Sequence, residues 1–290
     1  MTSTAIETLT LDVPGATLTY DVRGPLPTDG SPPLVLIGQP MDAGGFTTLA
    51  SHFADRTVVT YDPRGLGRSV RHDGTVDQTP QQQADDVHRI ITALGGGPVD
   101  LFGSSGGAIT ALCLAATHPD DVRTVVAHEP PVLSILPDAD RALAAWDRVR
   151  ATYDTRGWGW GMAAFIAMTM WQGEYPEGFG TDSPDPAAFG IPAEDDGSRD
   201  DPLLSGAAWA IVHYRPDVAA LSASAVRVVP AAGIESKGTM TWRTTAALAD
   251  QLGVDLVVFP SNHGGFMGGE YGQTGEPEAF AARLREVLAG

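Results

Sequence analysis

Cysteine is almost absent from this chain of 290 residues, which contains a single one, Cys113. One cysteine cannot form a disulfide within the chain, so the sequence shows no adaptation to an oxidising compartment. Cys113 lies in an apolar stretch, residues 111–116, where a small buried hydrophobic side chain is the expected role. Disulfide-stapled folds and catalysis by a thiol are therefore both disfavoured.

Positive charge is also scarce, and lysine occurs once, as Lys237. The 18 Lys and Arg residues stand against 36 Asp and Glu, and the formal charge of −18 disfavours nucleic acid or an anionic membrane as a partner. No apolar run is long enough to span a bilayer, and residues 1–15 lack the basic and apolar segments of a signal peptide. The sequence therefore predicts a cytoplasmic protein with a small-molecule partner and leaves its oligomeric state open.

Hydrophobic residues make up 43% of the chain, in short β-rich runs that alternate with helical patterns. This alternation indicates an α/β fold with a doubly wound, mostly parallel sheet covered by helices. Strands are predicted at residues 8–13, 16–22, 33–37, 57–61, 99–102, 122–127, 226–232 and 256–259. Helices of the same pattern are predicted at residues 81–94, 108–116, 241–252 and 277–288. In such a fold the functional site lies at the carboxyl ends of the strands.

The alternation stops between residues 132 and 225. Two predicted helices there, 138–153 and 160–171, are followed by an acidic stretch rich in Pro and Gly, residues 175–202. Loops of that length are uncommon inside a compact domain unless they are functional or mobile. We therefore predict a core formed by residues 1–131 and 226–290, with a mainly helical lid, residues 132–225, inserted between two strands.

Gly103-Ser104-Ser105-Gly106-Gly107 fits the pattern G-x-S-x-G, with Ser105 at its centre. A predicted strand precedes the pattern and a small-residue helix follows it, which is the context in which such a serine acts as a nucleophile. The turn is so sharp that the residues two before and two after the serine must be small, and Gly103 and Gly107 meet that need. The amino terminus of the helix also presents the N–H of Gly106 to a developing oxyanion.

With this motif, the chain resembles the α/β-hydrolase fold family over nearly its whole length. The segment Asp62-Pro63-Arg64-Gly65-Leu66-Gly67-Arg68-Ser69 resembles the D-x-R-G-x-G-x-S turn of that family, for which a structural role is expected. The family carries its catalytic histidine on the loop after the last strand, and His263 matches that place. Histidine suits the role because it can take the serine proton near neutral pH and return it to the leaving group.

The acid that completes the triad has two candidates. In the commoner family pattern the acid follows the strand at residues 226–232, where this chain has Glu235 and, at the place often held by aspartate, Ser236. Glu129 follows the preceding strand, in His128-Glu129-Pro130-Pro131, and resembles the acid of zearalenone lactonases and of one group of haloalkane dehalogenases. Either position can bring a carboxylate beside the histidine, to fix its tautomer and stabilise its cation. We favour Glu129 and keep Glu235 as the alternative.

The resemblance also implies an oxyanion hole in which the backbone N–H of Gln39 joins that of Gly106. The Gln39 side chain has two open roles, contact with substrate or a purely structural one. Side chains of the predicted lid that could line an apolar substrate pocket are Trp158, Trp160, Met162, Phe165, Met168, Met170 and Trp171. Metal-ligand patterns such as H-E-x-x-H and C-x-x-C do not occur, so neither a metal nor another cofactor is expected.

Together these residues predict a serine hydrolase that cleaves a carboxylic ester or lactone of a hydrophobic small molecule through an acyl-enzyme. One fold hosts many chemistries, so two alternatives stay open. The first is a C–C bond hydrolase, or a cofactor-free lyase or cyclase, acting on a polyketide-like compound; the second is a non-catalytic small-molecule receptor. Epoxide hydrolase and haloalkane dehalogenase chemistry are disfavoured, because both need aspartate where this chain has Ser105.

Overall fold

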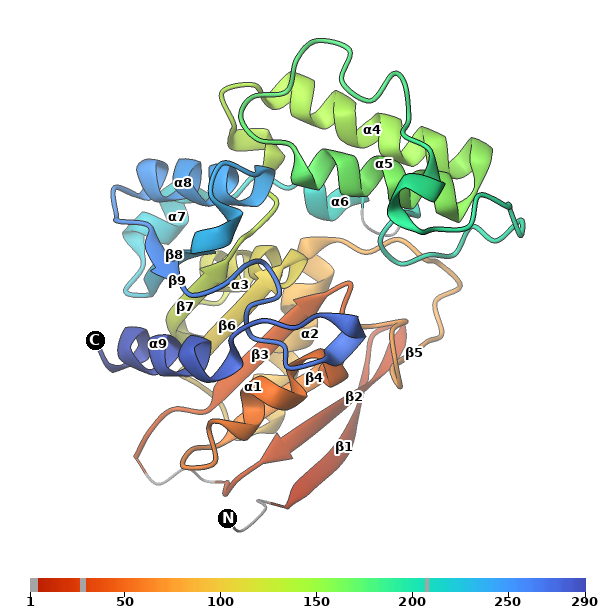
Figure 1. Ribbon diagram of the computed structural model, residues 1–290. Helices are drawn as coiled ribbons and strands as arrows, with labels where there is room; N and C mark the ends of the chain where they lie inside the picture. Colours follow the sequence, from red (N-terminus) through yellow and green to blue (C-terminus); the bar gives the residue numbers. More distant parts are fainter. Residues whose placement is uncertain (1–4, 27–29, 207–208) are drawn as a thin grey trace.

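A nine-stranded sheet runs through the computed structural model, which describes residues 5–26, 30–206 and 209–290 (Figure 1). The strand order is β1-β2-β4-β3-β6-β7-β8-β9, with β5 paired to β2. In this spatial order the adjacent strands β4, β3, β6, β7, β8 and β9 are parallel to one another. Strand β2 pairs antiparallel with β1, β4 and β5. The bounds are β1 Ile6–Val13, β2 Ala16–Arg23, β3 Leu34–Gln39, β4 Val58–Asp62, β5 Val70–Arg71, β6 Val99–Ser105, β7 Val122–His128, β8 Arg227–Gly233 and β9 Val257–Phe259. The central strands are buried almost throughout, as expected where helices cover both faces.

Helices cover the two faces of this sheet in separate layers (Figure 1). One apolar cluster joins the strands to α2, α3 and α8, and a second joins them to α1 and α9. The bounds of these helices are α1 Thr47–Ser51, α2 Pro80–Ala93, α3 Gly106–Thr117, α8 Met240–Leu252 and α9 Pro277–Ala289. The arrangement confirms the doubly wound α/β architecture that the sequence predicts.

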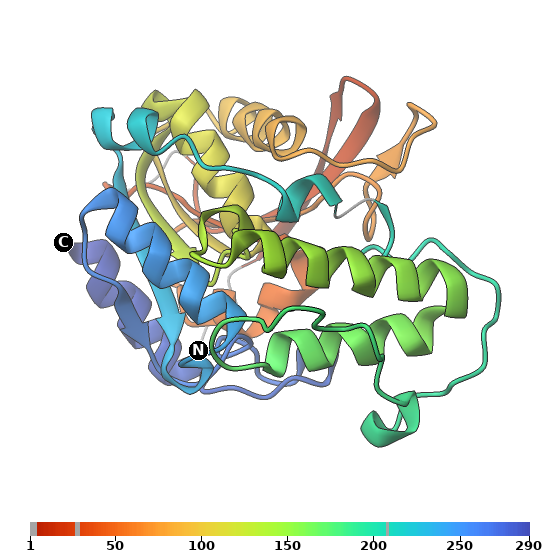
Figure 2. The ribbon, with the colours of Figure 1, turned by 90° about the horizontal axis from the view of Figure 1, so that it is seen from above.

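We call residues 132–225 the β7–β8 insertion; its helices α4 and α5 lie over the end of the sheet at which the central strands finish (Figures 1 and 2). The helices of the insertion are α4 Ala139–Arg156, α5 Trp158–Met170, α6 Trp209–Val212 and α7 Val218–Ala223. Figure 2 shows α4 and α5 side by side, and they share an apolar cluster of their own that includes Trp146, Val149 and Met168. Met240 of α8 belongs to the same cluster, so α4 and α5 pack onto the main body at α8, whereas Ile211 of α6 and Leu221 of α7 join the cluster of the sheet, α2 and α3.

The predicted helices and strands are all present, with ends that differ by a few residues. The most consequential difference is at residue 105, where β6 ends and α3 begins at once, two residues earlier than predicted. The elements that were not predicted, α1, α6, α7 and β5, are six residues or shorter, too short to show a periodic pattern. In the part of the chain that the structure describes, no helix is long and apolar enough to cross a membrane.

Candidate active site

Ser105 lies at the junction of β6 and α3, with backbone angles φ 57° and ψ −127°. A positive φ strains any side-chain-bearing residue, and such strain clusters at functional sites. A Cβ at Gly103 would lie 2.6 Å from the carbonyl oxygen of Gly107, and a Cβ at Gly107 would lie 2.1 Å from that of Ile37. Only glycine fits at either position, as the sequence predicts. The two glycines let strand β6 and helix α3 meet in this turn.

Glu129 directly follows β7, where it has a φ of 50° and is fully buried. Its backbone N–H donates to the carbonyl oxygen of Ala231 at 2.9 Å, which joins the end of β7 to β8. Its Oε1 accepts a hydrogen bond from the N–H of Gly233 at 2.9 Å, and its Oε2 accepts one from Oγ1 of Thr241 at 2.6 Å. A buried carboxylate is tolerated only when it is bonded in this way, so the neighbouring β8 and α8 hold Glu129 in place.

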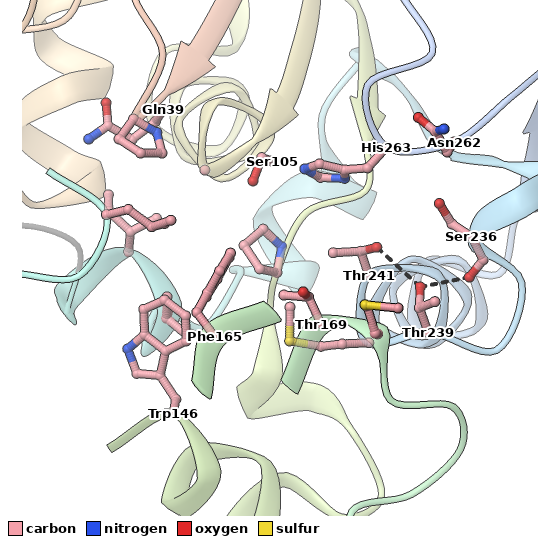
Figure 3. Close-up of a pocket in the computed structure, with 18 of the residues that line it drawn as sticks. Gln39, Ser105, Trp146, Phe165, Thr169, Ser236, Thr239, Thr241, Asn262 and His263 are labelled. Carbon is pink, nitrogen blue, oxygen red and sulfur yellow. Dashed lines mark hydrogen bonds between the residues drawn. The ribbon is translucent and has the colours of Figure 1, made fainter. Parts of the chain in front are cut away.

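His263 lies on the loop after β9, and its ring extends toward Ser105 (Figure 3). Its Nδ1 lies 2.6 Å from Oε2 of Glu129. Burial would raise the pKa of Glu129, but the charge and hydrogen bond of His263 outweigh burial and hold this pKa well below its usual range. Burial would likewise lower the pKa of His263, but the hydrogen bond and charge of Glu129 raise it. Because an ionised carboxylate can only accept, Nδ1 carries the proton and Nε2 is free to accept another.

Glu235, the alternative acid, lies on the turn after β8 and is exposed. Its carboxylate accepts a hydrogen bond from Asn262 at 3.3 Å and none from His263. Ser236, the next residue, is buried, and its hydroxyl helps to lower the pKa of Glu129 through a hydrogen bond. The structure thus brings His263 together with Glu129 and leaves Glu235 at the rim.

Gln39 is the last residue of β3, and the parallel register of β3 and β6 pairs it with Ser105. A Cβ on Gly106 would lie 2.8 Å from the carbonyl oxygen of Gln39, so these two backbones are close neighbours beside the serine. The two residues predicted to supply oxyanion donors are therefore neighbours, as two donors to one oxyanion must be. The Gln39 side chain is buried and turns away from Ser105 (Figure 3), and its Nε2 donates to Oε1 of Gln78 at 2.6 Å. Of its two open roles, the contacts are those of the structural one.

Ser105 and His263 face a pocket of about 330 Å³ beneath the insertion (Figure 3). Its apolar lining consists of Pro40, Pro131, Trp146, Phe165, Met170, Leu203, Ile211, Val212 and Met240. Polar side chains also line it: Gln39, Thr169, Glu235, Ser236, Thr239, Thr241 and Asn262. Among the described residues that line the pocket, Glu235 alone is a carboxylate and none is Lys or Arg.

Of the seven side chains predicted to line an apolar pocket, Phe165 and Met170 line the one at Ser105 and the other five do not. Met162 packs against the insertion's own core. Met168 is fully buried in the insertion's own core. The tryptophans have partners elsewhere: Trp158 donates to Asp201, Trp160 lies against the guanidinium of Arg156, and Trp171 donates to the backbone of Glu174. The physical reason is that α5 is apolar on every side, so its sequence does not indicate which face meets the strand ends. Trp146 of α4 also lines the pocket and was not predicted, because α4 is amphipathic and its apolar face is accounted for by the insertion's own core, to which Trp146 belongs.

His128, next to Glu129, lies beneath the site with its ring centroid 6.2 Å from that of His263. Phe102, Phe259, Phe266 and Phe280 surround it, and neither ring nitrogen has a hydrogen-bond partner among the described residues. Burial lowers the pKa of His128 to about 4, so its ring is neutral near pH 7. It therefore adds volume beneath the Glu129–His263 pair without adding charge.

The cluster best suited to a metal ion, His88, His118 and Asp121, involves none of the site residues. Its possible ligand atoms all lie within 4.8 Å of one another. The side chains also satisfy one another without an ion, because Nδ1 of His88 lies 2.5 Å from the Asp121 carboxylate and the two imidazoles stack at 4.1 Å. We assign no metal to this cluster.

Comparison with known proteins agrees with this fold. Residues 32–182, just over half of the chain, match the family described as alpha/beta hydrolase fold. The protein named uncharacterized hydrolase YraK from Bacillus subtilis is 29% identical, over 96% of this chain and 95% of its own length. An esterase from Thermogutta terrifontis superposes with a TM-score of 0.66 at 21% identity, over 98% of both chains. The enol-lactonase from Burkholderia xenovorans LB400 superposes with a TM-score of 0.63 at 18% identity, over 97% of this chain and 100% of that one.

Proposed function

The chain belongs to the alpha/beta hydrolase fold family and is a hydrolase, and from this premise we propose that it is a serine hydrolase acting on a carboxylic ester or lactone of a neutral, hydrophobic small molecule. The observation that carries the proposal is the 2.6 Å contact of His263 Nδ1 with the buried Glu129 carboxylate, in a ring that extends toward Ser105. Two similar structures are named as an esterase and an enol-lactonase, which agrees with this reaction class.

In the first half of the proposed reaction, Oγ of Ser105 attacks the carbonyl carbon and its proton passes to Nε2 of His263. Glu129 keeps its bond to Nδ1–H, and its negative charge stabilises the imidazolium. The carbonyl oxygen becomes an oxyanion that accepts hydrogen bonds from the N–H groups of Gln39 and Gly106. His263 then gives its proton to the leaving alkoxide oxygen, the C–O bond breaks, and the acyl group remains on Ser105.

In the second half, water takes the place of the leaving alcohol. His263 accepts a proton from the water as its oxygen attacks the acyl carbon, and the same two N–H groups hold the new oxyanion. The intermediate collapses, the C–O bond to Ser105 breaks, and His263 returns the proton to Oγ. The products are an acid and an alcohol, which for a lactone are the two ends of one molecule. Since His263 carries each proton, the cycle needs no cofactor.

The lining of the pocket supports a neutral substrate with a sizeable hydrocarbon part. Nine of the lining residues are apolar, and apolar linings with a few polar groups are typical of small-molecule sites. A carboxylate on the substrate would meet Glu235 at the rim and a chain with a formal charge of −18, both of which repel it. The β7–β8 insertion acts in this proposal as the lid, because it supplies Trp146, Phe165, Met170 and Leu203 to the wall over Ser105.

The test is turnover of p-nitrophenyl esters of increasing acyl length and of a neutral aryl-substituted lactone, with acid quenching and intact mass measurement. We expect hydrolysis and a transient acyl adduct on Ser105 in the wild type. Ser105→Ala should lose the adduct and about 10³-fold or more of the rate, as when an activated serine is removed. Ser104→Ala is the matched control: Ser104 is buried beside Ser105, and its loss should leave the adduct in place. Undiminished turnover in Ser105→Ala would contradict the proposal.

A further inference from the structure

Four buried polar side chains form a hydrogen-bond network, which we call the glutamine network. None of these four side chains takes part in the proposed reaction. Nε2 of Gln39 and Nε2 of Gln83 both donate to Oε1 of Gln78, at 2.6 and 2.5 Å, and Oε1 of Gln83 accepts from Oγ1 of Thr110 at 2.7 Å. None of the four residues is more than 4% exposed. Gln39 ends β3, Gln78 precedes α2, Gln83 is on α2 and Thr110 is on α3, so the network joins three elements.

A fixed acceptor determines how the amides of this network are oriented. Nε2 of Gln78 donates to the backbone oxygen of Arg64 at 3.2 Å, and a carbonyl oxygen can only accept. Oε1 of Gln78 must therefore face Gln39 and Gln83, and it accepts from both. Arg64 is itself immobilised, because its buried guanidinium is paired with Asp86 of α2. The network thus has one hydrogen-bonding pattern, anchored on a rigid part of the core.

Gln39 needs such an anchor because its strand has lost one neighbour. β3 pairs with β4 only from Leu34 to Leu36, whereas its pairing with β6 continues as far as Gln39 and Ser105. On the β4 side no ladder holds Gln39. Its side chain makes one hydrogen bond among the described residues, to Gln78, and its Oε1 is buried without a partner. The position of Gln39 on that side therefore depends on Gln78.

We infer that Gln78 is a positioning residue for the oxyanion hole. By holding the Gln39 side chain it fixes the direction of the Gln39 N–H, and through Gln83 and Thr110 it ties this N–H to α3, whose first residue supplies the second donor. The inference rests on the proposed function. It follows from how oxyanion holes work, since donors stabilise the developing charge only when they already point at it.

The test is a double-mutant cycle with Gln39→Met and Gln78→Met, which keep side-chain volume and remove the bond from either end. Loss of a whole oxyanion donor costs about 10²–10³-fold in kcat, and a misdirected donor should cost less, about 10-fold. We expect kcat to fall with KM unchanged. The second readout is the Ki of a substrate-like trifluoromethyl ketone, because its adduct places an oxyanion in the hole. This Ki should rise in parallel with the fall in kcat/KM. Gln78→Met also removes the bonds to Gln83 and Arg64, but the one side-chain bond that Gln39→Met removes is already lost in Gln78→Met. The double variant should therefore be no worse than the more damaged single variant.

Thr57→Val is the matched control, because Thr57 is buried and its hydroxyl donates to the Pro25 carbonyl at 2.5 Å, outside the network and the pocket. Its thermal unfolding should shift while kcat and Ki stay at wild-type values. Unchanged kcat and Ki in the network variants, or losses that add in the double variant, would overturn the inference. If Gln78→Met does not fold, Gln39→Met alone is the test: a raised Ki supports the inference and an unchanged Ki overturns it. A wild type that neither hydrolyses esters nor binds the ketone would instead defeat the proposed function.

Discussion

Two neighbouring parallel strands, β7 and β8, each lead into a glutamate, yet the two carboxylates have opposite surroundings. Glu129 after β7 is fully buried and is bonded to Gly233, Thr241 and His263. Glu235 after β8 is exposed and accepts one hydrogen bond of 3.3 Å from Asn262. The end of β8 thus supplies hydrogen-bond donors to a carboxylate that comes from β7. The hydrogen-bond donors around Glu129, more than its distance from the histidine loop, therefore make Glu129 and not Glu235 the partner of His263.

The largest expected effect of this difference is on the rate. Glu129→Gln keeps the shape of the side chain but cannot stabilise the imidazolium, and removal of a triad carboxylate's charge costs about 10⁴-fold in kcat. Glu235→Gln, the matched control, removes one exposed charge and should change kcat by less than about twofold. Ester hydrolysis by the two purified variants is the measurement. Equal losses, or a larger loss in Glu235→Gln, would reverse the assignment.

The difference between the two strand ends can be tested by moving the acid to the end of β8. Ser236 is buried, its hydroxyl helps to lower the pKa of Glu129, and it lines the same pocket as His263, so we expect an aspartate at this position to reach the imidazole when residue 129 is glutamine. We expect Glu129→Gln/Ser236→Asp to regain about 10-fold or more of the lost rate, because a carboxylate again orients the imidazole. Glu129→Gln/Ser236→Asn is the control of equal size without charge. If the Asp and Asn variants hydrolyse esters equally slowly, a carboxylate at the end of β8 cannot replace Glu129.

The donors around Glu129 can be removed one at a time. Thr241→Val keeps the shape of the side chain and deletes the 2.6 Å bond to Oε2. We expect kcat to fall about 5-fold, a fraction of the full strength of a hydrogen bond to a charge. Thr245→Val is the control on the same helix, because within the described part of the chain that hydroxyl bonds only to the backbone of Thr241. Loss of rate in both variants would show a general effect of α8 instead.

The smallest expected effect is on the pH profile. His263 acts as a base only when neutral, so kcat/KM rises as pH increases through its pKa. Glu129 raises that pKa, and the acidic limb of the wild-type profile should therefore lie above the ordinary imidazole value of about 6.5. In Glu129→Gln the residual activity should have its acidic limb at lower pH. A limb at the same pH in both proteins would mean that Glu129 does not act on the ionisation of His263.

Those parts of the fold and site that depend on neighbours in the chain could be predicted from the sequence. Gly103 and Gly107 identify Ser105 because the steric demand of the turn lies within four residues. The choice between Glu129 and Glu235 is different, because it depends on distant donors. Gly233 and Thr241, which donate to Glu129, follow it in the sequence by 104 and 112 positions. The glutamine network could not be predicted either, because Gln39 and Gln78 are 39 residues apart and carry no motif. The pocket wall was only partly predicted, because an apolar helix does not show which of its sides is covered.

The most direct test of the central claim, that Glu129 activates Ser105 through His263, is the rate at which a fluorophosphonate labels Ser105, followed by intact mass. The account predicts equal rates for the wild type and Glu235→Gln, far slower labelling of Glu129→Gln, and none of Ser105→Ala. Labelling of Glu129→Gln at the wild-type rate would contradict it.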